Sequence, residues 1–143
     1  MVSFHIEPTS KCTLECPLCD RTWFYEKFKK RLLHEVNVNN LVNFIGANQT
    51  VVMCGNNGDP IYHSQFHELC QKLKDNNNVI HITTNGSAKT KTWWKKLIQI
   101  LDENDSVQFS IDGLEDTNHL YRKNAKWKSI MNAINVMQNR KCK

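Results

Sequence analysis

Three of the six cysteines lie close together, at Cys12, Cys16 and Cys19. Their C-x3-C-x2-C spacing lets three thiolates converge from one short loop, and soft sulfur ligands are typical of iron–sulfur clusters and zinc sites. Three thiolates are one fewer than a closed cubane requires, so one iron would keep the open position that a catalytic metal needs. The alternatives are a structural zinc site completed by a histidine such as His5 or His34, and three unrelated buried thiols.

Three polar, glycine-containing segments further along the chain also carry groups suited to binding. Glycine permits close approach of the backbone and positive φ, and a carboxylate held in a turn can accept hydrogen bonds from an ammonium group. Hydroxyl and amide side chains are suited to a sugar or an amino-acid carboxylate. Taken singly, each segment is better explained as an ordinary turn or helix cap. The segments are Gly55-Asn-Asn-Gly58-Asp59-Pro60, Thr83-Thr84-Asn85-Gly86-Ser87 and Ser110-Ile-Asp112-Gly113.

The elements that must position these groups follow from the apolar pattern. Short segments rich in β-branched or aromatic residues predict strands at 2–7, 50–54, 79–84 and 106–111. Between and after them, apolar residues at helical spacing predict helices at 38–45, 66–73, 94–101 and 127–137, the first begun by an asparagine cap. The predicted order is therefore β-α-β-α-β-α-β-α.

Repeated βα units favour an α/β fold with a parallel sheet, and such sheets gather their chemistry beyond the carboxyl ends of the strands. The cysteine loop and the three polar segments each follow a predicted strand. We therefore expect all four to meet in one cleft.

With these motifs in this order, the chain resembles the radical S-adenosylmethionine (radical SAM) superfamily from Val2 to about Met137. The resemblance implies that Cys12, Cys16 and Cys19 hold a [4Fe–4S] cluster, whose fourth iron binds the amino and carboxylate groups of S-adenosylmethionine. It further implies that one electron from the cluster breaks the bond from sulfur to C5′. The resulting 5′-deoxyadenosyl radical would abstract a hydrogen atom from a substrate.

The same resemblance implies the contacts to S-adenosylmethionine. The segment with Gly58, Asp59 and Pro60 is similar to the family's Gly-Gly-Glu-Pro motif, which receives the methionine amino group, with aspartate in place of the usual glutamate. Leu18 stands where the family commonly has an aromatic residue beside the adenine. Arg122 is expected to meet the carboxylate. Further expected contacts, near the ribose and methionine moieties, are Thr84, Asn85, Ser110 and Asp112.

The resemblance also implies a partial, open TIM-type barrel, of which four of the usual six βα units can be identified. Residues 1–143 would form a single radical SAM core domain that lacks the last two units. The strand at 106–111 would then be an exposed edge, which proteins normally cover. We therefore expect a homo-oligomer or a partner chain at that edge.

The leading hypothesis is a radical SAM enzyme that acts on an unidentified peptide, nucleoside, RNA or small molecule and takes electrons from a donor such as flavodoxin or ferredoxin. The alternatives are a non-catalytic iron–sulfur, S-adenosylmethionine-binding or electron-transfer module, and a zinc-stabilised interaction domain with a basic surface. The net charge of +5 fits the last alternative, although solvated helix faces explain it as well. Since no apolar run approaches about 18 residues and no signal-peptide pattern is present, we expect a cytoplasmic protein with no membrane partner.

Overall fold

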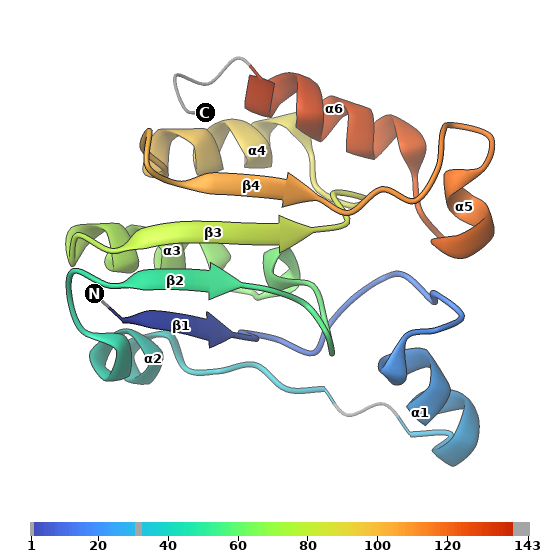
Figure 1. The fold of residues 1–143 in the computed structure, drawn as a ribbon, viewed down its shortest axis with the longest axis horizontal. Coiled ribbons are helices and arrows are strands. Elements are labelled where there is room, and N and C mark those ends of the chain that lie inside the picture. Colours follow the sequence, from blue (N-terminus) through green and yellow to red (C-terminus); the bar gives the residue numbers. More distant parts are fainter. Residues whose placement is uncertain (1, 31–32, 139–143) are drawn as a thin grey trace.

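The computed structural model describes residues 2–30 and 33–138. In this part of the chain four strands form one sheet, in the order β1-β2-β3-β4 (Figure 1). All neighbouring strands are parallel, which confirms the predicted α/β class. The strands are β1 (Ser3–Ile6), β2 (Thr50–Met53), β3 (Val79–Thr84) and β4 (Ser106–Phe109).

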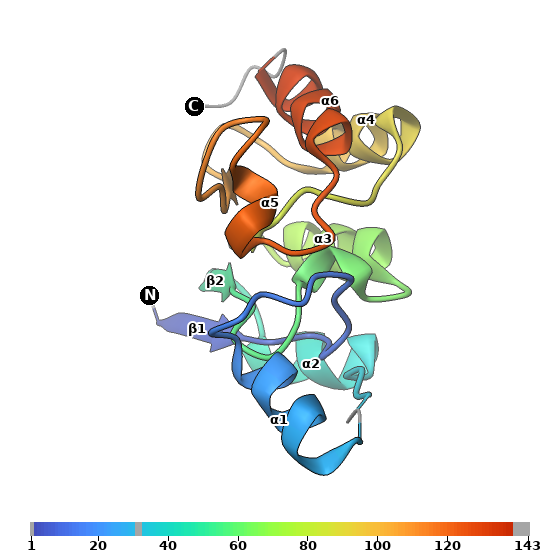
Figure 2. The ribbon, with the colours of Figure 1, turned by 90° about the vertical axis from the view of Figure 1, so that its right-hand side faces the viewer.

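Helices cover one face of the sheet and leave the other face open (Figure 2). Along this layer α2 packs against α3, α3 against α4, and α4 against α6. An open parallel sheet with helices on a single face is a partial barrel, as expected. The helices are α1 (Asp20–Phe28), α2 (Val38–Ile45), the 3-10 helix η1 (Pro60–Tyr62), α3 (Phe66–Asp75), α4 (Lys91–Ile100), α5 (Asn118–Tyr121) and α6 (Trp127–Gln138). Each helix of the described ranges is too short or too polar to span a lipid bilayer.

The core lies between the sheet and these helices. In β3, Ile80 and Ile82 are fully buried while His81 and Thr83 on the other face stay half-exposed. The register places Val52 beside His81, so the open face continues across the sheet. Since alternate residues of a strand point to opposite faces, one face supplies the core and the other remains available. From the helices, the core takes Val42, Leu69, Leu73, Trp94, Leu97 and Ala133.

The helix at 38–45 begins as predicted, because the side chain of Asn37 accepts a hydrogen bond from the N–H of Asn40 at 3.1 Å. The structure also contains α1 and α5, which the apolar pattern does not predict. The α1 helix has no buried residue, so its sequence shows no apolar stripe. The α5 helix has four residues, which is too short for periodicity to appear.

Candidate functional site

The loops at the carboxyl ends of the four strands line one cavity of about 320 Å³. This volume lies at the lower end of the range of ligand pockets, roughly 300–1,000 Å³. Two of the expected site residues, Pro60 and Asp112, do not line it. Those that do are Cys12, Cys16, Leu18, Cys19, Gly58, Asp59, Thr84, Asn85, Ser110 and Arg122. The structure therefore brings ten residues from four separate segments together, while their roles toward a cofactor stay predictions.

The cysteine loop runs from β1 to α1 and keeps all three thiols free and half-buried. The N–H of Cys19 donates to the carbonyl of Cys16 at 3.1 Å, which closes a tight turn between two of the thiols. The Sγ of Cys12 accepts hydrogen bonds from the N–H of Leu14 at 3.4 Å and from Nδ2 of Asn85 at 3.5 Å. Donors aimed at sulfur stabilise a thiolate, which is the form that binds a metal.

Burial raises the pKa of Cys12 to about 11, and burial likewise raises the pKa of Cys16 above its ordinary value. Without a metal these two thiols are therefore neutral at pH 7. Metal binding must displace their protons, as at other thiolate sites.

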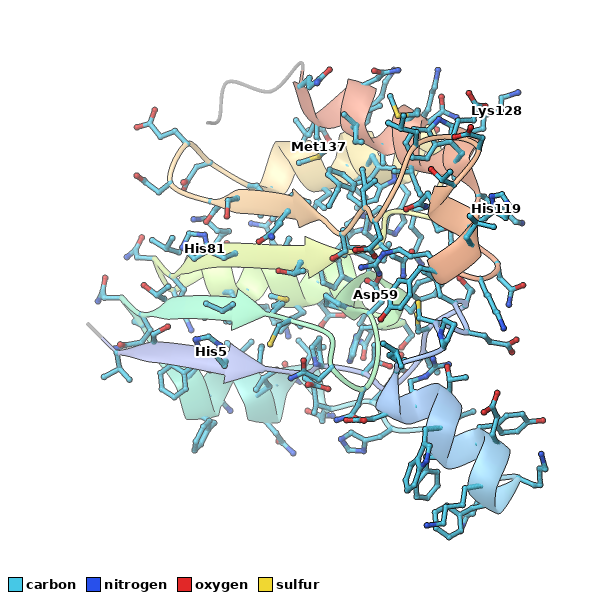
Figure 3. The ribbon with its side chains drawn as sticks, turned by 45° about the vertical axis from the view of Figure 1, so that its right-hand side comes forward. His5, Asp59, His81, His119, Lys128 and Met137 are labelled. Carbon is cyan, nitrogen blue, oxygen red and sulfur yellow. The ribbon has the colours of Figure 1, made fainter. Side chains whose placement is uncertain are left out.

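Three free thiols on the wall of one cavity are a donor set that suits a metal with a preference for sulfur, such as the iron of a cluster or zinc. Among residues 2–30 and 33–138, no three His, Cys, Asp or Glu side chains are arranged to hold one metal ion. Neither His5 nor His34 lines the cavity, and Figure 3 shows His5 within β1 while Asp59 lies at the carboxyl edge. The site therefore offers three sulfur ligands and no histidine as a fourth.

The glycines after β2 allow the backbone of this loop to lie against the cysteine loop. A Cβ on Gly58 would stand 2.0 Å from the carbonyl oxygen of Thr9 and 2.8 Å from Cα of Ser10. A Cβ on Gly55 would meet the carbonyl oxygen of Gly58 at 2.2 Å. The close approach expected from the sequence is present. Neither Gly55 nor Gly58 has a positive φ, so these positions require glycine because of the close contact alone.

Asp59 is 3% exposed and joins the ends of β2 and β3 (Figure 3). Its carboxylate accepts hydrogen bonds from Oγ1 of Thr84 at 2.9 and 3.0 Å, from the N–H of Asn85 at 2.8 Å and from the N–H of Ile61 at 3.3 Å. Burial raises the pKa of this carboxyl, against the opposing effect of its hydrogen-bond donors. The hydroxyl of Thr84 has one hydrogen, so the carboxylate has three donors, which leaves about one of its roughly four acceptor positions for another group. The expected role of Asp59 toward an ammonium group stays a prediction, and its observed role is to hold two loops together.

The remaining expected contacts differ in how they are held. Leu18 is 84% exposed at the rim of the cavity, where its side chain is free to meet a ligand. Arg122 Nε lies 2.5 Å from Oδ2 of Asp112, so this arginine lines the cavity with an acidic partner beside it. Asp112 thus contacts the site through Arg122.

Sequence reasoning missed two residues that shape these loops. Arg21, at the start of α1, donates from Nη1 to the carbonyl of Leu14 at 3.2 Å and from Nη2 to the carbonyl of Cys12 at 3.0 Å. Glu7, just after β1, accepts the N–H groups of the two residues that follow Gly55, at 3.1 and 2.9 Å. In the sequence, only their position could have indicated this role, because the two charged residues lie on either side of the cysteine loop.

A second cavity, of about 590 Å³, lies on the other side of the cysteine loop. It is lined by aromatic residues of α1, including Trp23 and Phe24, and it shares Cys12, Asp20 and Arg21 with the first cavity. The two hollows therefore share residues at Cys12 and at the start of α1, and the second one is also lined by aromatic side chains of α1.

Comparisons with known proteins agree with this geometry. The family model of the Radical SAM superfamily matches residues 6–143. Native anSMEcpe with bound AdoMet is a similar solved structure, with a TM-score of 0.71 and 19% identity over 100% of this chain and 43% of that chain. The same protein with bound AdoMet and Kp18Cys peptide gives a TM-score of 0.70 and 20% identity over 99% of this chain and 41% of that chain. With bound AdoMet and Cp18Cys peptide, that protein gives a TM-score of 0.66 and 20% identity over 96% of this chain and 40% of that chain.

These likenesses, at about a fifth identity, establish the fold. The chain spans less than half the length of the solved structures that it matches. A comparison with curated proteins gave no match.

Proposed function

Because this chain belongs to the radical SAM superfamily, we propose that Cys12, Cys16 and Cys19 hold a [4Fe–4S] cluster and that the protein cleaves S-adenosylmethionine reductively. When bound, the cluster would supply the electron that splits S-adenosylmethionine into methionine and a 5′-deoxyadenosyl radical, which takes a hydrogen atom from a substrate. The observation that carries the proposal is the single cavity shared by the three free thiols and the carboxyl-end loops of β2, β3 and β4.

Within this proposal the chain's own residues bind and orient the cosubstrate. Leu18 at the rim would contact the adenine, and Arg122 would attract the carboxylate. Gly58 and Asp59 would form the wall beside the amino group, and Pro60 follows them in the same segment. The polar side chains that would lie along the ribose and methionine moieties are Thr84, Asn85, Ser110 and, through Arg122, Asp112. Arg21 holds the cysteine loop at the start of α1 through its two hydrogen bonds to loop carbonyls.

We further propose that residues 1–143 act as one core domain of four βα units. In the described sheet β1 and β4 are the edge strands, and β4 is the edge to which further barrel strands would add. A partner chain or a second copy of this chain would cover it, because an open edge invites aggregation. A monodisperse monomer in solution scattering, with cluster and activity intact, would contradict this part of the proposal.

The reaction also needs partners. An electron donor such as flavodoxin or ferredoxin would reduce the cluster, and the hydrogen atom would come from a peptide, a nucleoside, an RNA or a small molecule. Two similar structures hold a peptide together with AdoMet, so peptides are the first class to test.

The experiment is anaerobic reconstitution with iron and sulfide, followed by reduction in the presence of S-adenosylmethionine and chromatography for 5′-deoxyadenosine. We expect about four irons per chain and formation of 5′-deoxyadenosine. Cys16→Ala should lose cluster and product together, because two thiolates do not retain a cubane at this site. Cys54→Ala is the matched control and should keep both, since Cys54 is half-buried after β2 and does not line the cavity.

Each alternative has its own result. Cluster assembly without 5′-deoxyadenosine would identify a non-catalytic iron–sulfur or electron-transfer module. Uptake of zinc, with no iron and sulfide, would identify a zinc-stabilised domain and overturn the proposal.

A further inference from the structure

Asn85 lies buried in the turn after β3, with 5% of its surface exposed, and is fixed at three points. Its N–H donates to Oδ2 of Asp59 at 2.8 Å, and its side-chain Oδ1 accepts the N–H of Ser87 at 2.9 Å. Its side-chain Nδ2 then points at Sγ of Cys12, 3.5 Å away. A side chain held this firmly presents its amide to the sulfur in one orientation.

The neighbours of Asn85 determine which end of the amide faces the sulfur. The backbone N–H of Ser87 can only donate, so it requires the amide oxygen, and the NH2 group is left for Cys12. Ser87 is itself fixed, because it is 1% exposed and its Oγ accepts the N–H of Lys126 at 2.7 Å. Turning the amide over would bring two donors together at Ser87 and leave the buried N–H of Ser87 without an acceptor.

A thiolate ligand is an acceptor, and the hydrogen bond from Nδ2 becomes stronger as the sulfur gains negative charge. Reduction of a cluster adds that charge, so donors to its sulfurs favour the reduced state and raise the reduction potential. We propose that Asn85 is a positioning residue that donates to the Cys12 ligand and raises the potential of the cluster. Asp59 accepts the N–H of Asn85 and so holds the turn from which the Asn85 amide donates to Cys12. This inference rests on the proposed function, because it requires the cluster.

The test compares Asn85→Ala and Asn85→Asp with the wild-type protein, each reconstituted anaerobically, in a potentiometric titration followed by EPR in the absence of S-adenosylmethionine. A hydrogen bond to a charged group contributes about 1.5 kcal/mol, which is roughly a tenfold change in the ratio of reduced to oxidised cluster. For a one-electron couple that change is about 59 mV, and it is expected toward more negative potential in Asn85→Ala. Asn85→Asp should be lower still, because it replaces the donor with an acceptor of nearly the same shape.

Ser87→Ala is the matched control. It removes a buried hydroxyl from the same turn and keeps the N–H that holds the amide of Asn85, so its potential should equal that of the wild type. A purely structural role of Asn85 would lower cluster content and leave the potential of the remaining cluster unchanged.

The outcomes separate the two proposals. If the wild-type protein assembles no cluster, the proposed function fails. If it assembles a cluster and both Asn85 variants keep its potential, the proposed function stands and this inference is overturned. Loss of the cluster in both variants would also overturn it, because Asn85 would then serve assembly.

Discussion

Gly58→Ala tests how tightly the loop after β2 supports the cysteine loop. The added Cβ would lie 2.0 Å from the carbonyl oxygen of Thr9, whereas ordinary contact begins at 3.4 Å, so the two backbones must separate by about 1.4 Å. Overpacking of this kind typically costs 1–3 kcal/mol, which for a chain of this length lowers Tm by roughly 3–12 °C. Ligand sites tolerate only about 0.5 Å of displacement, so the larger effect should fall on the cluster.

The assay is thermal unfolding of the metal-free protein together with iron content after reconstitution. Gly58→Ala should lower Tm and lose most of the bound iron, because Cys12 follows two residues after the displaced Ser10. Gly46→Ala is the matched control: Gly46 has a φ of 75° and no neighbouring atom within 4 Å of an added Cβ. It should cost about 1–3 kcal/mol from backbone strain alone, because a φ of 75° with a ψ of −147° is a conformation that residues other than glycine rarely adopt, and it should keep its iron. Wild-type iron content in Gly58→Ala would refute the reasoning.

Two further substitutions separate stability from cluster binding. Asp105→Ala should lower the free energy of unfolding, measured by urea denaturation, by about 3 kcal/mol. The reason is that this carboxylate is 1% exposed, accepts the N–H of Ile80 at 2.7 Å and pairs with Lys74 at 3.0 Å. A change below about 1 kcal/mol would contradict these contacts. Arg21→Lys keeps the positive charge but cannot bridge two carbonyls, one of them on Cys12, so it should lower iron retention during gel filtration with little change in Tm. Equal iron retention would show that the guanidinium does not shape the loop.

The sequence predicts the elements that bury apolar residues and misses those that do not. The strand at 79–84 has the predicted bounds, because alternate residues of a buried strand give a strong pattern. In α1, Trp23 and Phe28 are 54% and 52% exposed, so the aromatic residues there form no buried stripe. That helix depends on its place beside the cysteine loop, which local sequence does not encode.

The candidate site was predictable where it depends on spacing and strand order. Three cysteines in one loop and polar segments after successive strands are visible in the sequence, and the parallel sheet brings them to one edge. The partners of single side chains were not predictable. Asp59 meets Asn85 only because the register places Met53 beside Ile82, so that the loops after these two strands lie side by side.

The cysteine loop is held mainly by the ends of neighbouring strands. The N–H of Asp59 donates to the carbonyl of Lys11 at 2.9 Å, Gly58 lies against Thr9, and Asn85 reaches Cys12 from the end of β3. Each contact joins residues far apart in the chain, so the loop can take this shape only when the sheet has formed. It follows that the three thiols are positioned by folding of the sheet. Loss of the proposed cluster should therefore accompany a substitution that pushes the backbones of these loops apart, as Gly58→Ala does, even where every cysteine is kept.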